Sequence, residues 1–148
     1  MLDIAKQKDD AHYNIAKLIY SYQLNKGDKP TYADWTFERA LNEINTAIQI
    51  TQQPIYYQVQ GDIYFAMQKY AEAFTAYDTV NKSSLASAAT FYSSAKAKDL
   101  MEGVDKKEVV ALMDSAVARF NKPYGKDAAP YLYERAGAKQ LLKISGEP

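Results

Sequence analysis

Apolar residues recur with helical spacing along almost the whole of this chain. In three segments, which begin at Ala40, Ala73 and Val109, apolar positions fall at i, i+1, i+4 and i+7 and so share one helix face. Proline and glycine fall mostly between such segments, where helices end. The pattern predicts an all-α chain with helices near residues 5–25, 34–51, 54–67, 70–82, 84–102, 106–121 and 129–144.

A second similarity links two segments that are 76 residues apart. Each has a proline, an aromatic residue three positions later and a glycine four positions further on: Pro54, Tyr57 and Gly61, then Pro130, Tyr133 and Gly137. Proline is favoured in the first turn of a helix, whereas a glycine inside a helix costs about 1 kcal/mol relative to alanine. We therefore expect a neighbouring helix to approach each glycine closely.

The recurrences indicate helix hairpins stacked as repeats, because similarity at a fixed period of about 30–45 residues is typical of solenoid proteins. The expected helices pair as hairpins: the first with the second, the third with the fourth, and the fifth with the sixth. We predict a single domain over residues 1–148. Its approximate repeats are 5–53, 54–83 and 84–122, and a helix at 129–144 opens a fourth.

Residues 54–80 resemble the tetratricopeptide repeat (TPR), a helix–turn–helix unit of about 34 residues. The first helix of that repeat carries two aromatic residues around a small one, and the second carries two aromatic residues around an alanine. The matching residues are Tyr57, Gly61, Tyr64, Tyr70, Ala73 and Tyr77. Gln60 departs from the pattern, since the repeat has leucine there. The resemblance implies a right-handed α–α superhelix of about seven helices, and a TPR-containing protein of bacterial type.

The last expected helix has no hairpin partner. Its apolar residues Tyr133, Leu141 and Leu142 would then lack a cover, although terminal repeats normally present a polar face. We expect the chain to be a fragment of a longer repeat protein that self-associates through this C-terminal helix. The alternative is that the helix itself caps the array.

Charge and composition narrow the class of partner. Eighteen basic residues match eighteen acidic ones without a long run of either sign, so neither nucleic acid nor a membrane surface is an expected partner. No apolar run reaches the ~18–20 residues of a membrane span, and the absence of cysteine excludes thiolate chemistry. Abundant tyrosine and few arginines resemble bacterial envelope repeat proteins. That slightly favours the periplasm over the cytoplasm, but the compartment stays open.

His12 is the single histidine of the chain, and Asp9 stands three residues before it. A metal pair or a histidine–carboxylate dyad is conceivable at this spacing, but nothing at ligand spacing supplies a third group. We expect an ordinary histidine on a helix surface. No phosphate loop, nucleophile elbow or HExxH motif occurs, so we expect no enzymatic activity, no cofactor and no metal.

The resemblance to TPR proteins implies that the first helix of each repeat lines a concave groove that binds a protein or peptide. The corresponding residues are Tyr13, Lys17, Tyr20, Ile55, Gln58, Asp62, Phe65, Tyr92, Lys96, Asp99, Tyr131 and Glu134. The first hypothesis is a non-catalytic scaffold for a protein or peptide partner of unknown identity. Two alternatives remain: a glycan-binding module of a bacterial envelope system, and an accessory domain of a larger enzyme.

Aromatic residues are abundant enough to need an interpretation. We expect four tyrosines at repeat positions to pack between helices: Tyr57, Tyr64, Tyr70 and Tyr77. Packing and binding stay equally open for four others: Tyr20, Tyr56, Tyr92 and Tyr131. Trp35 is expected to pack the long first connection onto the helices, with a ligand platform as the alternative.

Overall fold

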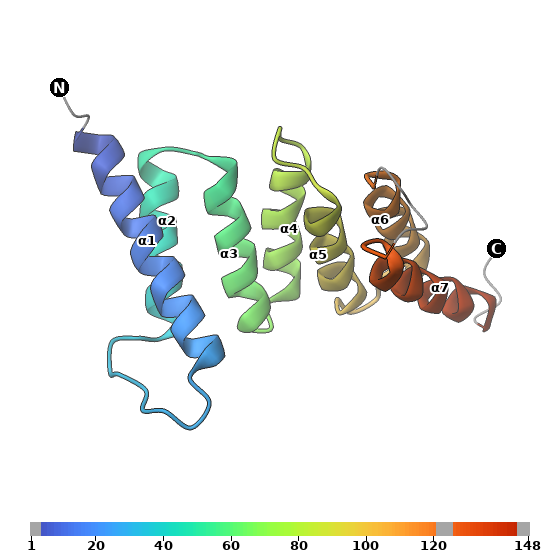
Figure 1. Cartoon of the computed structure of the whole chain (residues 1–148), viewed down its shortest axis with the longest axis horizontal. Helices are drawn as coiled ribbons and strands as arrows, with labels where there is room; N and C mark the ends of the chain where they lie inside the picture. The colour runs from blue at the N-terminus through green and yellow to red at the C-terminus, as the bar shows by residue number, and fades with distance from the viewer. Residues whose placement is uncertain (1–3, 121–125, 145–148) are drawn as a thin grey trace. The chain divides into compact units, whose positions relative to one another are not determined.

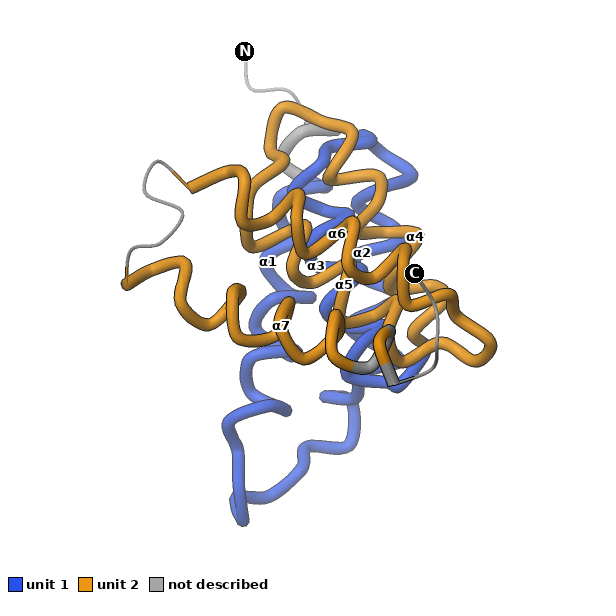
Figure 2. The backbone as a smooth tube through the Cα atoms, turned by 90° about the vertical axis from the view of Figure 1, so that its right-hand side faces the viewer, with its two compact units in different colours: residues 1–69 blue, residues 70–148 orange. Residues whose placement is uncertain are grey.

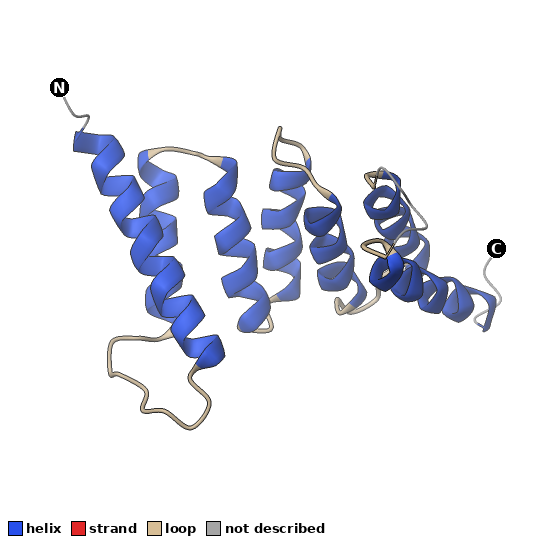
Figure 3. Ribbon diagram, in the orientation of Figure 1, coloured by secondary structure: helices blue, strands red, loops and turns tan. Residues whose placement is uncertain are grey.

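The structure, a computed structural model, describes residues 4–120 and 126–144, with side chains at residues 8–120, 126–140 and 143. Within these residues it forms seven α-helices and no strand, which confirms the all-α prediction (Figures 1 and 3). The helices are α1 (Ile4–Asn25), α2 (Phe37–Ile50), α3 (Pro54–Ala66), α4 (Tyr70–Asn81), α5 (Ala88–Asp99), α6 (Lys106–Ala118) and α7 (Ala129–Ile144).

The chain divides into two compact units, residues 1–69 and residues 70–148 (Figure 2). Unit 1 contains α1 to α3, and unit 2 contains α4 to α7. The boundary falls between Lys69 and Tyr70, inside the repeat that the sequence places at 54–83. The single domain over 1–148 stays a prediction.

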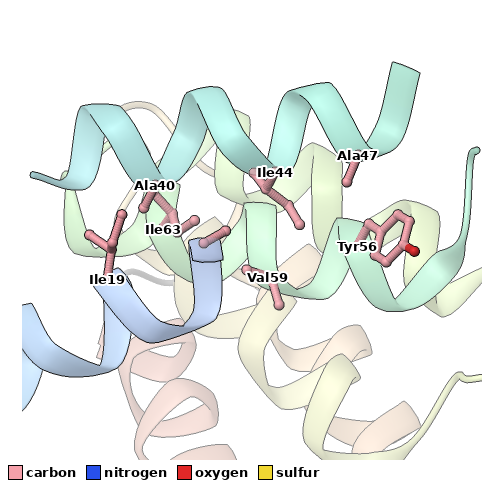
Figure 4. Close-up of a cluster of buried hydrophobic side chains, with 8 residues drawn as sticks. Ile19, Ala40, Ile44, Ala47, Tyr56, Val59 and Ile63 are labelled. Atoms are coloured by element: carbon pink, nitrogen blue, oxygen red, sulfur yellow. The ribbon is translucent and has the colours of Figure 1, made fainter. Parts of the chain in front are cut away.

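Unit 1 is built around the predicted apolar face of α2. Ala40, Ile44 and Ala47 are fully buried there, as their i, i+4 and i+7 spacing predicts. They pack with Ile19 of α1 and with apolar residues of α3 in one core cluster (Figure 4). Removing these side chains from water is the main favourable contribution to the stability of the unit.

Tyr56 is the large aromatic residue of this core, with 1% of its surface exposed. Its ring lies 5.0 Å from that of Tyr13, centroid to centroid. The next residue, Tyr57, is only half-buried. The tyrosine that is buried in α3 is therefore one position earlier than the aromatic residue of the repeat pattern.

A buried carboxylate joins the start of α1 to the link between α2 and α3. Asp9 is 0% exposed and accepts hydrogen bonds from the Thr51 hydroxyl and, at 2.7 Å, from the Tyr56 hydroxyl. These two bonds stabilise the ionised form and lower the pKa of Asp9 despite its burial. Its other carboxylate oxygen, Oδ1, is buried without a hydrogen-bond partner among the described residues.

Capping residues determine where two helices begin. The Thr36 hydroxyl accepts the backbone N–H of Arg39, so α2 starts at Phe37 rather than at the predicted residue 34. Ser87 and Thr90 cap each other's backbone N–H groups, so α5 starts at Ala88 rather than at residue 84. Both predicted starts were three to four residues early, because the apolar pattern extends into the preceding link.

Unit 2 is a chain of neighbouring helices in which α4 packs on α5, α5 on α6 and α6 on α7. The predicted apolar faces of α4 and α6 are buried, which confirms them as the core of this unit. The residues are Ala73, Tyr77, Val80, Val109, Met113 and Ala116. A polar contact accompanies them, since the Asn81 side chain donates to the buried Ser94 hydroxyl at 2.9 Å.

The close approach expected at Gly137 does not occur among the described residues. A Cβ added there would meet none of their heavy atoms within 4 Å, and the residue is exposed on α7. Tyr133 is also exposed, at 80%. The side chains of Leu141 and Leu142, on which the expectation of self-association rests, lie outside the described residues.

Candidate functional site

The predicted binding residues of unit 1 lie on α1 and α3. On α1, the Lys17 ammonium lies 4.9 Å from the centre of the Tyr13 ring, a cation–π contact one helical turn apart. Tyr13 also packs against the core of unit 1 and contacts the buried Tyr56 ring on α3. Tyr13 is thus both a packing residue and the ring on which a cation rests.

Tyr20, Gln58 and Asp62 form a second, more polar group in unit 1. The Gln58 amide donates to Asp62 Oδ1 at 3.3 Å, an i, i+4 contact along α3. Burial, aided by the nearby negative charge of Asp62, raises the pKa of Tyr20 to about 12. Two further predicted residues of α3 lie at its ends: Ile55 is exposed and Phe65 is half-buried.

In unit 2, α5 and α7 bring four predicted residues together. The rings of Tyr92 and Tyr131 meet edge to face with their centroids 4.5 Å apart. Burial raises the pKa of Tyr92, and the charge of Glu134 and a hydrogen bond with its carboxylate raise it further. The Lys96 ammonium lies 5.4 Å from the centre of the Tyr92 ring. We call these four residues the α5–α7 cluster.

Asp99 is not part of the α5–α7 cluster. It forms an ion pair with Lys106 across the turn between α5 and α6. That pair closes the turn, where Asp105 caps the start of α6 by accepting the backbone N–H of Lys107 at 2.9 Å. The described contacts of Asp99 are those of a structural residue.

Two aromatic residues near the cluster were not among the predicted binding residues. Phe120 lies 5.3 Å from Tyr131 and extends the group of rings. The second is Phe91, next to Tyr92: the Arg119 guanidinium carbon lies 4.4 Å from the centre of the Phe91 ring. In the sequence, Arg119 and Phe120 follow directly after the predicted apolar face that begins at Val109, which could have indicated them as contact residues. They were missed because neither stands at a position that the repeat pattern assigns to binding.

His12 makes a contact that the sequence did not predict. Its Nδ1 lies 2.5 Å from Glu43 Oε2, which joins α1 to α2, and Arg39 lies 3.7 Å from the other Glu43 oxygen. Asp9 instead faces Thr51 and Tyr56, so the Asp9–His12 dyad is not formed. Among the residues whose side chains are described, no three His, Cys, Asp or Glu residues gather closely enough to hold a metal ion.

Nothing in the described part of the chain resembles a membrane-crossing helix in both length and apolar content. Comparisons with protein families, with curated proteins and with solved structures found no match to this chain. The geometry of its own residues is therefore the basis for inferring a function.

Proposed function

We propose that this protein is a non-catalytic, TPR-like scaffold that binds an extended peptide segment of a partner protein, with one candidate face on α1 and α3 of unit 1 and another on α5 and α7 of unit 2. The observation that carries the proposal is the α5–α7 cluster. The repeat pattern assigns Tyr92 to one repeat and Tyr131 to the next, and their rings lie in contact at 4.5 Å. Contact across non-consecutive helices is what a shared binding face requires.

The chemistry of the α5–α7 cluster favours a peptide over a small charged ligand. Tyrosine supplies a large contact area with few rotatable bonds, and its hydroxyl can bond to a backbone amide or carbonyl group. Lys96 and Glu134 place one charge of each sign beside the rings. Such a surface matches the aromatic centre and polar rim of peptide and protein interfaces.

The contacts in unit 1 support the same proposal independently. Lys17 over Tyr13, and Tyr20 near Asp62, again combine an aromatic ring with one charge on α1 and α3. Because the charges balance in both groups, we expect a partner segment without a strong net charge.

The test uses a displayed library of random linear peptides selected on the whole chain, followed by fluorescence polarisation with the enriched peptides. Tyr92→Ala should weaken binding about tenfold or more, since truncating an aromatic anchor costs about 2 kcal/mol. Tyr133→Ala is the matched control, because Tyr133 is an exposed tyrosine of unit 2. Circular dichroism should show that both variants remain folded.

The proposal fails if no peptide is enriched, or if the enriched peptides bind the Tyr92→Ala and Tyr133→Ala variants with equal affinity.

A further inference from the structure

Beyond the proposed peptide face, the long link between α1 and α2 forms a separate surface feature in unit 1. Tyr22 at the end of α1 contacts Tyr32 and Trp35 in this link, and the three ring centroids are 5.1–5.4 Å apart. Tyr32 nevertheless remains 53% exposed. Trp35 is half-buried and packs against the core of unit 1, as expected, whereas Tyr32 leaves a large part of its ring at the surface. An exposed ring held beside a packed tryptophan is a candidate contact surface for a ligand.

The link is held in place by hydrogen bonds between its backbone and the last turns of α1. The Tyr22 hydroxyl donates to the Pro30 carbonyl at 2.6 Å, and the Gln23 amide donates to the Trp35 carbonyl. Gly27 takes a positive φ of 55°, which allows the chain to turn away from α1. The aromatic cluster is therefore positioned before any ligand arrives, which lowers the entropic cost of binding.

Two adjoining hollows open beside this cluster. The first, of about 270 Å³, is lined by Tyr32, Ala33, Asp34, Trp35 and Arg39. The second, of about 490 Å³, shares Ala33, Asp34 and Arg39 with the first. It is completed by Thr36, Glu38 and Asn42 at the start of α2. We call the two together the loop hollow; its size falls near the range of small-molecule sites.

The polar groups of the loop hollow have spare hydrogen-bonding capacity. Within the described residues, the side chains of Asp34, Glu38 and Asn42 make no hydrogen bond or ion pair. Arg39 makes one long contact, from Nε to Glu43 at 3.7 Å, which leaves its terminal N–H groups available. The hollow thus presents carboxylate acceptors, guanidinium donors and an amide that does both.

This combination selects among ligand classes. A phosphate or other anion would meet Asp34 and Glu38 as well as Arg39, so like-charge repulsion disfavours it. A quaternary ammonium ligand would suit the rings and carboxylates but would be repelled by Arg39. A sugar ring has an apolar C–H face that can pack on the aromatic residues. Its hydroxyls both donate and accept hydrogen bonds, so they can bond to the carboxylates, the guanidinium and the amide alike.

We propose that the loop hollow binds a neutral saccharide, with Tyr32 and Trp35 contacting the face of a sugar ring and Asp34 and Arg39 bonding its hydroxyls. The site is shallow, so affinity for a disaccharide is expected on the order of millimolar. The proposal is independent of peptide binding on the helix faces.

Trp35 is the single tryptophan of the chain, so its emission reports on this site alone. The experiment screens the whole chain on an array of neutral glycans. It then titrates the chain with maltose, cellobiose, lactose and N,N′-diacetylchitobiose while tryptophan fluorescence is followed. Tetramethylammonium chloride and inorganic phosphate serve as the cation and anion probes.

A saturable change with at least one saccharide is expected, and Asp34→Ala should raise the half-saturation concentration at least tenfold. Asp28→Ala is the matched control, since Asp28 is an exposed aspartate of the same link that does not line the hollow. Tyr32→Ala should weaken binding, whereas Tyr92→Ala should not.

Three results would overturn the proposal: no saturable response to any array or titrated saccharide, a response only to tetramethylammonium or phosphate, or equal weakening by Asp34→Ala and Asp28→Ala. None of these results bears on the peptide test, which depends on Tyr92.

Discussion

Two glycines of unit 2 offer a matched test of the backbone. An added Cβ would meet no heavy atom of the described residues within 4 Å at either Gly103 or Gly137. They differ in conformation, since Gly137 lies inside α7 whereas Gly103 has a φ of 67° in the turn before α6. Alanine substitution at the two positions therefore isolates the backbone term from any steric clash.

The expected effects have opposite signs. Gly137→Ala should raise the free energy of unfolding by about 0.5–1 kcal/mol, because alanine loses less backbone entropy in a helix. Gly103→Ala should lower it by about 1–2 kcal/mol, because a Cβ disfavours the left-handed region. The two variants should thus differ by roughly 2 kcal/mol.

The assay is urea unfolding followed by far-ultraviolet circular dichroism, combined with thermal unfolding of the same variants. A change in the urea midpoint at constant m-value reports stability alone. Each kcal/mol should shift the Tm by about 4–8 °C if unit 2 unfolds by itself, and by about 2–4 °C if the whole chain unfolds together. The ratio of the Tm shift to the change in the free energy of unfolding therefore also tells whether the two units unfold separately or together.

A lower stability for Gly137→Ala would refute the reasoning. It would mean that another helix approaches Gly137 closely, as the repeat pattern had led us to expect. Equal effects of the two substitutions would show that φ at Gly103 is not the controlling difference.

Two further predictions concern unit 1. Ile44→Ala should lower the free energy of unfolding by about 2–5 kcal/mol, because it leaves a cavity in the core. Leu18→Ala is the control: its side chain is 57% exposed, so stability should change by less than about 0.5 kcal/mol. Urea unfolding measures both variants, and equal effects would contradict the assignment of the core. Because folding lowers the pKa of Asp9, the unfolded state binds more protons than the folded state as pH falls from the ordinary aspartate pKa of 3.8 toward the lowered pKa. The contribution of Asp9 to stability should therefore be present above pH 3.8 and be lost as pH falls through that range. Asp9→Asn should flatten the pH dependence of the Tm in this acidic window, and an unchanged slope would show that Asp9 is not the linked group.

The sequence was sufficient to predict the seven helices, because the apolar period and the proline and glycine positions agree. The α2 face shows why: Ala40, Ile44 and Ala47 recur at the helical period and are all fully buried. Helix starts were less accurate, since Ser87 is paired with a threonine rather than with the glutamate or glutamine of the usual capping box.

The partners of individual side chains could not be read from the sequence. Asp9 bonds to Thr51 and Tyr56, which are 42 and 47 residues away, and no local pattern specifies such contacts. Similarly, the rotation of α3 decides whether Tyr56 or Tyr57 is buried, and that rotation depends on packing against α1 and α2. The rings of Tyr92 and Tyr131, two residues that the repeat pattern had put on one expected binding face, do lie in contact, but their role in binding stays a prediction.

The order of helix packing has a consequence for folding kinetics. Within each unit, helices adjacent in the chain pack on one another: α1 with α2, α2 with α3, and α4 through α7 in succession. Such a topology has low contact order, for which folding times of microseconds to milliseconds are typical. The Asp9–Tyr56 hydrogen bond instead joins α1 to α3 and closes a long loop. We expect it to form after the hairpins, so substitutions there should accelerate unfolding more than they slow folding.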